Sequence, residues 1–378
     1  MSKERIRKKR IIWILICVLC FAICLVFYFV RSSIAAKQVS QQMAERWSDE
    51  KGFTQISCYF TRAAEMTRQR LIGLEHDIDD QLQEASIVVE NGSESARLWT
   101  DAYSAQGTLM VSTDRGSLNL KAMGVGGDFF QFHPMDLEYG NYFSDSDLNH
   151  DYVVIDEEIA WQLFGGIDVT GKIVYVSGEP HVISGVIKRP QGKMDVAAGL
   201  SESVIYVSMD TLEKYGNPDP INHYEIVMPN PIKGFAMSIL QDKIGVVDSE
   251  VELVENTNRY SLLSSLKLLE KFGYRSMNGK AIIYPYWENL ARGYEDILAL
   301  LAVFVLLFFA IPALAILCQL YYRWRHKKWT VGSLLKKLMD FLGDLRYRIG
   351  TGIRAKLASK KRKPISITFE EEDENEKE

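Results

Sequence analysis

A run at residues 166–172 carries most of a phosphate-binding loop. It reads Gly-Ile-Asp-Val-Thr-Gly-Lys, and loops of this kind hold nucleotide phosphates with backbone N–H groups and a lysine. The next residue is Ile173, however, where a serine or threonine should bind Mg²⁺. A strand pattern then follows where a helix should begin. We therefore interpret the run as a Gly-Lys turn between strands and predict no ATPase in this chain.

Two acidic segments have the oxygen ligands that a cation site needs. Residues 145–149 begin like an EF-hand calcium loop, but His150 stands where that loop needs glycine and Asp156 where it needs glutamate. Residues 75–80 are acidic as well, yet consecutive residues of a helix point to different faces. Neither segment predicts a metal site, and a solvated acidic surface explains residues 75–80.

The remaining reactive side chains lie in no recognisable motif. The histidines show no pair at a metal-ligand spacing such as His-x-x-x-His. No serine lies in a Gly-x-Ser-x-Gly nucleophile motif, and no basic surface interleaved with aromatic residues indicates nucleic-acid binding. We therefore predict no catalytic, cofactor-binding or metal site, no cofactor, no nucleic-acid partner and no enzymatic activity.

The elements around the Gly-Lys turn are short and alternate in type. Residues 153–155 predict a strand, and residues 157–164 predict a helix with acidic residues in its first turn and a Gly-Gly pair at its end. Residues 172–176 and 181–187 alternate apolar and polar side chains on either side of a Ser-Gly-Glu-Pro turn. That alternation predicts a β-hairpin.

This order of motifs over residues 139–190 resembles the extracytoplasmic core domain of MacB-type ABC transporter permeases. That family carries a Gly-x-x-Phe, a strand, a short helix ending in Leu-Phe-Gly, a Gly-Lys strand and a closing Ile-Gly-Val, and Ser184 stands here in place of that isoleucine. The residues that match these structural signatures are Gly140, Phe143, Leu163, Phe164, Gly165, Gly171, Lys172, Gly185 and Val186. The resemblance implies an α+β fold in which a small membrane-proximal βαβ lobe carries a β-rich inserted lobe.

Two uncharged apolar runs, residues 11–30 and 297–322, are each long enough to cross a hydrocarbon core of roughly 30 Å as a helix. Lysine and arginine precede the first run and follow the second, so the positive-inside rule places both termini in the cytoplasm. A cleaved signal peptide is the alternative for the first run. Its apolar region exceeds the usual signal core of about 7–15 residues, which favours a retained anchor.

We accordingly predict a two-span protein of the plasma membrane. Its segments are a basic cytoplasmic N-terminus (1–10), a transmembrane helix (11–30), an extracytoplasmic MacB-core-like domain (31–296) with a β-rich insert at about 126–204, a second transmembrane helix (297–322) and a cytoplasmic tail (323–378). Two β-α-β units bracket the insert, with strand, helix and strand at 53–60, 66–82 and 86–89, and at 224–228, 231–244 and 251–254. Residues 37–49 predict a polar helix, and residues 191–201 predict a mobile loop.

The cytoplasmic tail contains an apolar stripe flanked by basic residues. The stripe consists of Leu334, Leu335, Leu338, Leu342, Leu345 and Ile349, and the basic residues are Lys336, Lys337, Arg346 and Arg348. The pattern is typical of a helix that lies on an anionic leaflet, and a helix that docks onto a partner protein fits it equally well. Residues 370–378 form an acidic end that we expect to be disordered.

The family resemblance implies a membrane subunit related to ABC transporter permeases. Its domain would assist a transport or mechanotransmission complex whose ATPase is a separate chain. The family normally has a three-helix, FtsX-like membrane segment after this domain, whereas only the span at 297–322 follows it here. The bilayer, an ABC ATPase, an FtsX-like permease and further copies of the chain are therefore the expected partners.

Two alternatives of other classes stay open. One is a two-span scaffold or regulator with the topology of polysaccharide chain-length regulators, although no heptad repeats run through residues 31–296. The other is an anchored domain that binds an extracellular ligand.

Overall fold

The computed structural model describes residues 3–48, 52–87, 97–145, 147, 151–275, 279–326 and 339–340. The chain divides into two compact units, one of residues 18–309 and one of residues 1–17 with 310–378. The sheet, its helices and the sites described below all belong to residues 18–309.

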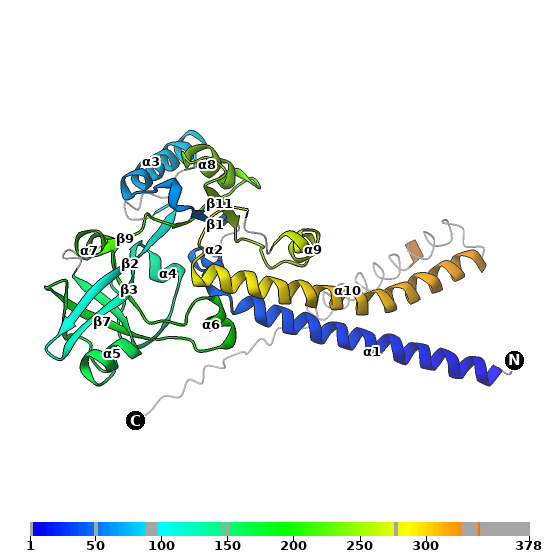
Figure 1. Cartoon of the computed structure of the whole chain (residues 1–378). Coiled ribbons are helices and arrows are strands. Elements are labelled where there is room, and N and C mark those ends of the chain that lie inside the picture. The colour runs from blue at the N-terminus through cyan, green and yellow to red at the C-terminus, as the bar shows by residue number, and fades with distance from the viewer. Residues whose placement is uncertain are drawn as a thin grey trace, which may run out of the picture. The chain divides into compact units, whose positions relative to one another are not determined.

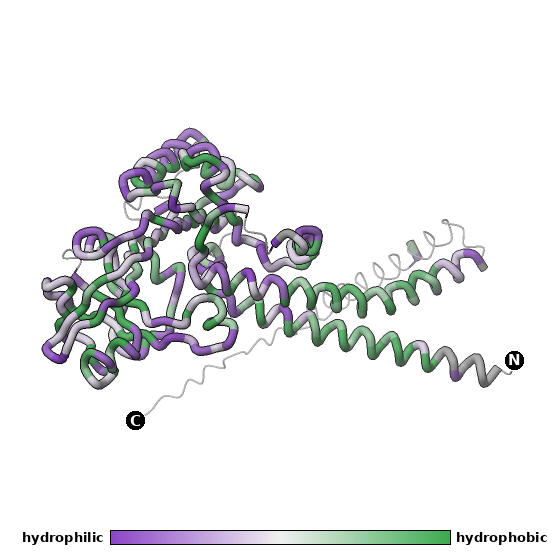
Figure 2. Tube along the Cα trace, viewed as in Figure 1, coloured by the Kyte–Doolittle hydropathy of each residue, from purple (hydrophilic) through white to green (hydrophobic). Residues whose placement is uncertain are grey.

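Two long helices carry the apolar runs. They are α1 (Lys3–Ala36) and α10 (Tyr286–His326). The segments Ile11–Ala36 and Tyr286–Arg325 are each long and apolar enough to span a membrane, and Figure 2 shows their hydrophobic character. Within residues 18–309 the two helices pack against each other, because the Phe27 ring stacks on the Phe304 ring with centroids 5.2 Å apart. The predicted pair of apolar helices is confirmed.

The two predicted β-α-β units together form one ferredoxin-like sheet. Its elements are β1 (Phe53–Phe60), α3 (Arg68–Glu84), β2 (Thr100–Thr113), β10 (His223–Pro229), α8 (Phe235–Lys243) and β11 (Val251–Glu255). The strand order is β11–β1–β10–β2, with antiparallel neighbours throughout. This is the split β-α-β arrangement. Helices α3 and α8 lie side by side over one face of the sheet (Figure 1).

The β-rich insert lies between β2 and β10 in the sequence, and its strands extend the same sheet. Its strands are β3 (Gly116–Gly127), β4 (Asp136–Gly140), β5 (Tyr152–Asp156), β6 (Ile173–Val176), β7 (Glu179–Lys188), β8 (Val204–Ser208) and β9 (Asn217–Pro218). Its helices are α4 (Phe129–Phe132), α5 (Glu157–Phe164), α6 (Lys193–Ala198) and α7 (Met209–Tyr215). The order from β2 is β3–β8–β5–β7–β4, with β3–β8 and β5–β7 parallel. The predicted α+β fold with an inserted β-rich lobe is therefore confirmed.

Local sequence patterns predicted several elements correctly. Helix α5 ends at Gly165, which adopts the left-handed conformation (φ 75°) that glycine takes without steric cost. Strands β6 and β7 form the predicted hairpin, and the two residues of its turn, Ser177 and Gly178, both have positive φ (51° and 94°). Two positive φ values are the mark of a type I′ turn, whose twist matches that of the flanking strands.

The predicted strand at residues 86–89 is wrong for the two of its residues that the structure describes. Ser86 is left-handed (φ 58°) and its N–H donates to the Gln83 carbonyl, while the Ile87 N–H donates to the Leu82 carbonyl at 2.9 Å. These two bonds form a Schellman motif, which closes α3 instead of starting a strand. The strand that completes the unit is β2, which begins at Thr100.

Other segments also differ from the predictions. The single polar helix predicted at residues 37–49 is wrong for its described residues, which form the short helices η1 (Val39–Gln41) and α2 (Met43–Trp47). The predicted mobile loop at 191–201 contains helix α6. Helix α8 begins at Phe235 instead of residue 231, because Gly234 is left-handed (φ 89°) and the Asn230 side chain accepts a hydrogen bond from the Ala236 N–H.

The two faces of the ferredoxin-like sheet differ in chemistry. Toward α3 and α8, alternate residues of β1 and β10 are mostly apolar and join the main core, which contains Ile56, Cys58, Phe60, Tyr224, Ile226 and Met228. The opposite face presents Gln55, Ser57, Tyr59, His223 and Glu225, all completely buried. Burying polar groups costs free energy unless they are hydrogen-bonded, so the elements that cover this second face must supply partners.

Candidate functional site at the base of the two long helices

The polar face of β1 and β10 is held in register by the strand pairing. Ser57 lies opposite Glu225, and Tyr59 lies opposite His223. The Ser57 hydroxyl donates to the Glu225 carboxylate and accepts a hydrogen bond of 2.7 Å from the Asn256 amide. We call these five residues of β1 and β10, namely Gln55, Ser57, Tyr59, His223 and Glu225, the polar face.

Gln55 of β1 binds the segment that follows α1 through two hydrogen bonds. Its amide nitrogen donates to the Ser40 carbonyl at 2.7 Å, and its amide oxygen accepts from the Met43 N–H at 2.8 Å. At the end of α1 itself, the buried Arg31 guanidinium donates to the Tyr260 carbonyl and to the Ser265 hydroxyl. Helix α1 is thereby tied both to the sheet and to the segment around α9 (Leu262–Lys271).

Glu288, in the first turn of α10, fastens the second long helix to the same face. It is completely buried and accepts from the Tyr59 hydroxyl at 3.0 Å. Arg259 donates to both of its carboxylate oxygens, at 2.7 and 2.8 Å, and Arg292 donates at 2.6 Å. Arg259 also pairs with Glu295 at 2.6 Å. A carboxylate in the first turn of a helix is further favoured by the helix dipole.

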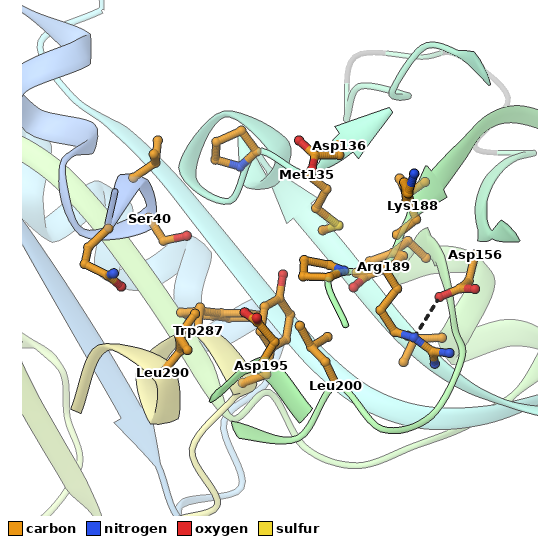
Figure 3. Close-up of a pocket in the computed structure, with 18 of the residues that line it drawn as sticks. Ser40, Met135, Asp136, Asp156, Lys188, Arg189, Asp195, Leu200, Trp287 and Leu290 are labelled. Atoms are coloured by element: carbon orange, nitrogen blue, oxygen red, sulfur yellow. Dashed lines mark ion pairs between the residues drawn. The ribbon is translucent and has the colours of Figure 1, made fainter. Parts of the chain in front are cut away.

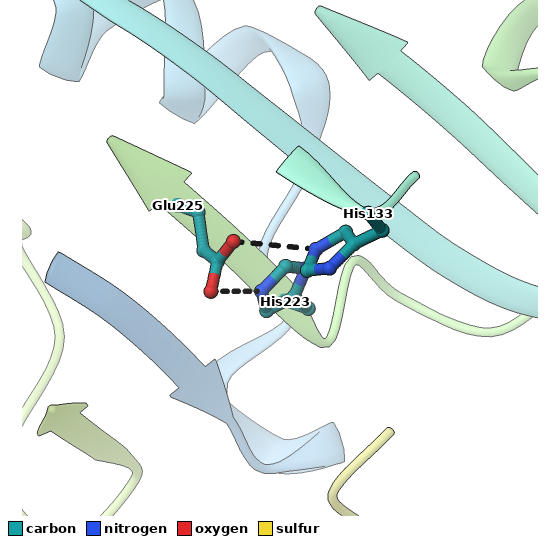
Figure 4. Close-up of side chains that lie close together, drawn as sticks. All are labelled: His133, His223 and Glu225. Carbon is teal, nitrogen blue, oxygen red and sulfur yellow. Dashed lines mark ion pairs between the residues drawn. The ribbon is translucent and has the colours of Figure 1, made fainter. Parts of the chain in front are cut away.

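Two histidines and Glu225 meet beside this network (Figure 4). His133 follows α4, and its Nε2 lies 3.2 Å from Glu225; the Nε2 of His223 lies 3.5 Å from the other carboxylate oxygen. The His133 ring stacks on the Trp287 indole of α10 with centroids 4.0 Å apart. We call His133, His223 and Glu225 the histidine–glutamate cluster.

Burial and charge act in opposite directions within this cluster. Burial lowers the pKa of His133 and outweighs the neighbouring Glu225 carboxylate, so this imidazole is neutral near pH 7. Burial alone would raise the pKa of Glu225, but the electrostatic attraction of the two neighbouring imidazoles lowers it below its ordinary value. The cluster therefore presents an anionic carboxylate to a neutral His133 ring.

Sequence reasoning missed this cluster because His133 lies far along the chain from β10. The alternation of a strand gives one usable signal: the His-x-Glu of β10 places His223 and Glu225 on one face. No local spacing indicates that His133 joins them. The expectation of no metal-ligand pair was thus drawn from local spacing alone.

A cavity of about 220 Å³ opens between the segment after α1, the start of α10 and the insert (Figure 3). Its apolar wall includes Met135, Leu200 and Trp287. Arg189 and Asp156 also line it and form an ion pair of 3.5 Å. The lining thus combines apolar surface with charges of both signs, and it does not select one class of ligand.

The nine signature residues lie in the insert, and none of them lines this cavity. Gly140 and Gly185 face each other across β4 and β7, and a Cβ added at Gly140 (φ 79°) would lie 2.1 Å from the Ser184 carbonyl oxygen. The Lys172 ammonium lies 5.3 Å from the centre of the Phe164 ring. The other signature residues also have structural roles within the insert. Leu163 is buried in α5, and Gly165 caps that helix. The Gly171 N–H donates to the Ile183 carbonyl, Val186 is buried in β7, and Phe143 packs edge-on to Phe130.

The predicted tail helix falls outside the residues that the structure describes. This applies to Leu334, Leu335, Lys336, Lys337, Leu338, Leu342, Leu345, Arg346 and Arg348. Asn149 and His150 of the calcium-like segment also fall outside them. The Gly-Lys run leads into strand β6, and no helix follows it, as the turn interpretation predicted.

A family model described as the MacB-like periplasmic core domain matches residues 23–235. The chain belongs to this family. The predicted resemblance to MacB-type permeases is therefore confirmed. The matched residues run from within α1 through the whole insert to the start of α8.

Solved structures of MacB-like domains resemble the chain at low sequence identity. The extracellular domain of the noncanonic ABC-type transporter YknZ from Gram-positive bacteria is 17% identical, with a TM-score of 0.33 over 53% of this chain and 99% of that one. The periplasmic region of MacB from Actinobacillus actinomycetemcomitans is 14% identical, with a TM-score of 0.36 over 59% of this chain and 94% of that one. No curated protein matches the chain.

Proposed function

We propose that this protein is a two-pass plasma-membrane subunit related to ABC transporter permeases. Both termini are cytoplasmic, and residues 31–296 form an extracytoplasmic domain. That domain couples to a transport or mechanotransmission complex whose ATPase is a separate chain, and a separate permease or further copies of this chain complete the membrane bundle. The protein is not an enzyme.

The attachment of α10 carries the proposal. Its first turn is fixed in the polar face through Glu288, and the same helix contains the apolar span. A displacement of the helix must therefore move the sheet or break the ion pairs of Glu288. Breaking a buried ion pair by removing one partner costs about 3–5 kcal/mol. The attachment of α10 to the polar face through Glu288, which we call the junction, therefore favours joint movement of the helix and the sheet.

Co-purification tests the partner. Full-length protein is isolated from its host membrane in a mild detergent, and its partners are identified by mass spectrometry. We expect an ABC-type nucleotide-binding subunit. Deletion of residues 334–349 serves as the matched variant, since we expect loss of that partner if the tail helix is its docking segment, and a retained partner if the helix only lies on the membrane. Recovery of glycan-assembly enzymes instead would support the scaffold class and overturn the proposal.

Cysteine labelling tests the topology. The native cysteines outside the apolar runs are limited to Cys58, which is buried. In a Cys318→Ser background, Glu179→Cys should react with a membrane-impermeant maleimide in intact cells, whereas Lys8→Cys should react only after permeabilisation. Both positions are exposed. The reverse pattern would refute the proposed orientation.

The observed fold weakens the scaffold alternative. That class is built on long extracytoplasmic helices, whereas the longest helix described between α1 and α10 is α3, with 17 residues, packed on a sheet. The cavity of about 220 Å³ is the observation that favours an anchored ligand-binding domain. That alternative predicts purification of the protein without any nucleotide-binding subunit.

A further inference from the structure

We propose that the histidine–glutamate cluster binds one divalent transition-metal ion of the class that includes Zn²⁺. Two imidazoles with one carboxylate are a donor set that zinc takes in proteins. The inference does not depend on the proposed function, because it rests on the three side chains alone. It departs from the sequence-based expectation of no metal site.

The spacing of the donor atoms fits a chelate. The His133 and His223 Nε2 atoms lie 3.2 and 3.5 Å from the two Glu225 oxygens. Zinc–nitrogen and zinc–oxygen bonds of about 2.0–2.2 Å in a tetrahedron place neighbouring donors roughly 3.3–3.5 Å apart. One donor atom from each of the three residues lies within 4.8 Å of the others. Closing the widest pair by up to roughly 1.5 Å would bring all three donor atoms to the spacing of a tetrahedral site.

The direction of the ring nitrogens also points to a metal. Both Nε2 atoms are fully buried, yet neither makes a hydrogen bond of acceptable geometry. The rings approach the carboxylate closely without aiming an N–H group at an oxygen. An unsatisfied buried donor or acceptor costs about 1–3 kcal/mol, and an ion bound by both nitrogens and the carboxylate would satisfy all of them together.

The surroundings supply outer-shell partners, and a cavity lies close to the cluster. The other ring nitrogen of His223 lies 3.4 Å from the Ser104 hydroxyl, and the Ser57 hydroxyl donates to Glu225. Such partners orient ligands in metal sites. The cavity of about 220 Å³ is lined by Pro134, which follows His133 in the sequence, and by Trp287, which stacks on the His133 ring.

A bound ion would join two parts of the fold. His133 comes from the insert, whereas His223 and Glu225 come from the ferredoxin-like sheet, beneath the start of α10. Metal binding would therefore stabilise the folded domain, because a ligand that binds only the native state shifts the unfolding equilibrium.

The test uses the full-length protein in detergent, carrying an affinity tag without histidines and stripped of metal with EDTA. Zn²⁺ affinity is measured by competition with a chromophoric chelator, and Co²⁺ absorption reports the coordination geometry. We expect one ion per chain. His133→Gln and Glu225→Gln should each weaken binding more than about 100-fold, which exceeds the roughly 10–100-fold cost of losing an outer-shell partner.

The matched control is His181→Gln. His181 is also a buried histidine, but it contacts Thr211 and lies in β7, away from the cluster. Equal zinc binding by the wild type and the cluster variants would assign the ion to other histidines and overturn the proposal. A second readout needs no variant: Zn²⁺, but not Mg²⁺, should raise the unfolding temperature of the wild type, and the absence of that shift would also overturn it.

Discussion

Replacing Glu288 by glutamine tests how α10 is attached to the sheet. The substitution preserves the shape of the side chain and its contact with the Tyr59 hydroxyl, but it removes the negative charge. Arg259, whose side chain is only 5% exposed, then loses the carboxylate that it grips with two hydrogen bonds. A buried guanidinium without that partner is the main source of the expected destabilisation.

The magnitude follows from the partners that remain. Removing one member of a buried ion pair costs about 3–5 kcal/mol. Arg259 keeps Glu295 at 2.6 Å, and Arg292 keeps Glu252 at 2.8 Å. The free energy of unfolding should therefore fall by about 3 kcal/mol, the lower end of that range. For a domain of this size, that change lowers the unfolding temperature by about 6–12 °C.

Thermal unfolding of the full-length protein in detergent measures this change. Glu158→Gln is the matched control, because Glu158 also pairs with an arginine, Arg189, at 2.8 Å but is 51% exposed. An exposed pair contributes only about 0–1 kcal/mol. Adding Arg259→Met to Glu288→Gln should recover part of the loss, since it removes the buried charge that was left unpaired. Equal destabilisation by Glu288→Gln and Glu158→Gln would refute the reasoning.

Two further substitutions are expected to act in opposite directions. Gly140→Ala should destabilise the insert by about 1–3 kcal/mol, because its Cβ would meet the Ser184 carbonyl; Gly166→Ala, with no atom within 4 Å of the added Cβ, is the control in the same thermal assay. Asp101→Asn should stabilise the domain near pH 7. Burial raises the pKa of Asp101 well above 3.8, and Glu75 raises it further, so the native state holds a proton that the unfolded chain releases. Wild-type stability therefore falls as the pH rises above about 4, and denaturant unfolding at several pH values should show the gain of the variant growing over that range; a gain independent of pH would contradict this cause.

The elements that local chemistry determines were predictable from the sequence. Helix α5 was predicted with its correct bounds because acidic residues mark its first turn and Gly165 marks its end. Strand β1 was predicted correctly because its residues alternate in polarity. The strand expected at residues 86–89 failed because an apolar residue, Ile87, also completes the Schellman motif of α3, and the sequence pattern does not separate these two uses.

The junction could not be predicted, because its residues come together only in the tertiary structure. Glu288 and Arg259 belong to segments that look like an interfacial helix start and a polar loop, and nothing local pairs them. His133 and Glu225 are separated by the whole of the insert after α4. The polar second face of β1 is buried because α2 packs against the strand and Glu288 of α10 bonds to Tyr59, contacts that no local pattern indicates.

The ion pairs of the junction are better explained by alignment than by stability. Apolar residues of similar volume in place of a buried ion pair are often neutral or stabilising, so stability alone does not explain an ion-pair network at this position. A carboxylate gripped by the planar fork of Arg259 accepts only a narrow range of orientations, whereas an apolar contact tolerates repacking. Helix α10 is therefore held at one rotation and one depth against the polar face. The coupling that we propose for α10 needs this fixed register, which the ion pairs provide.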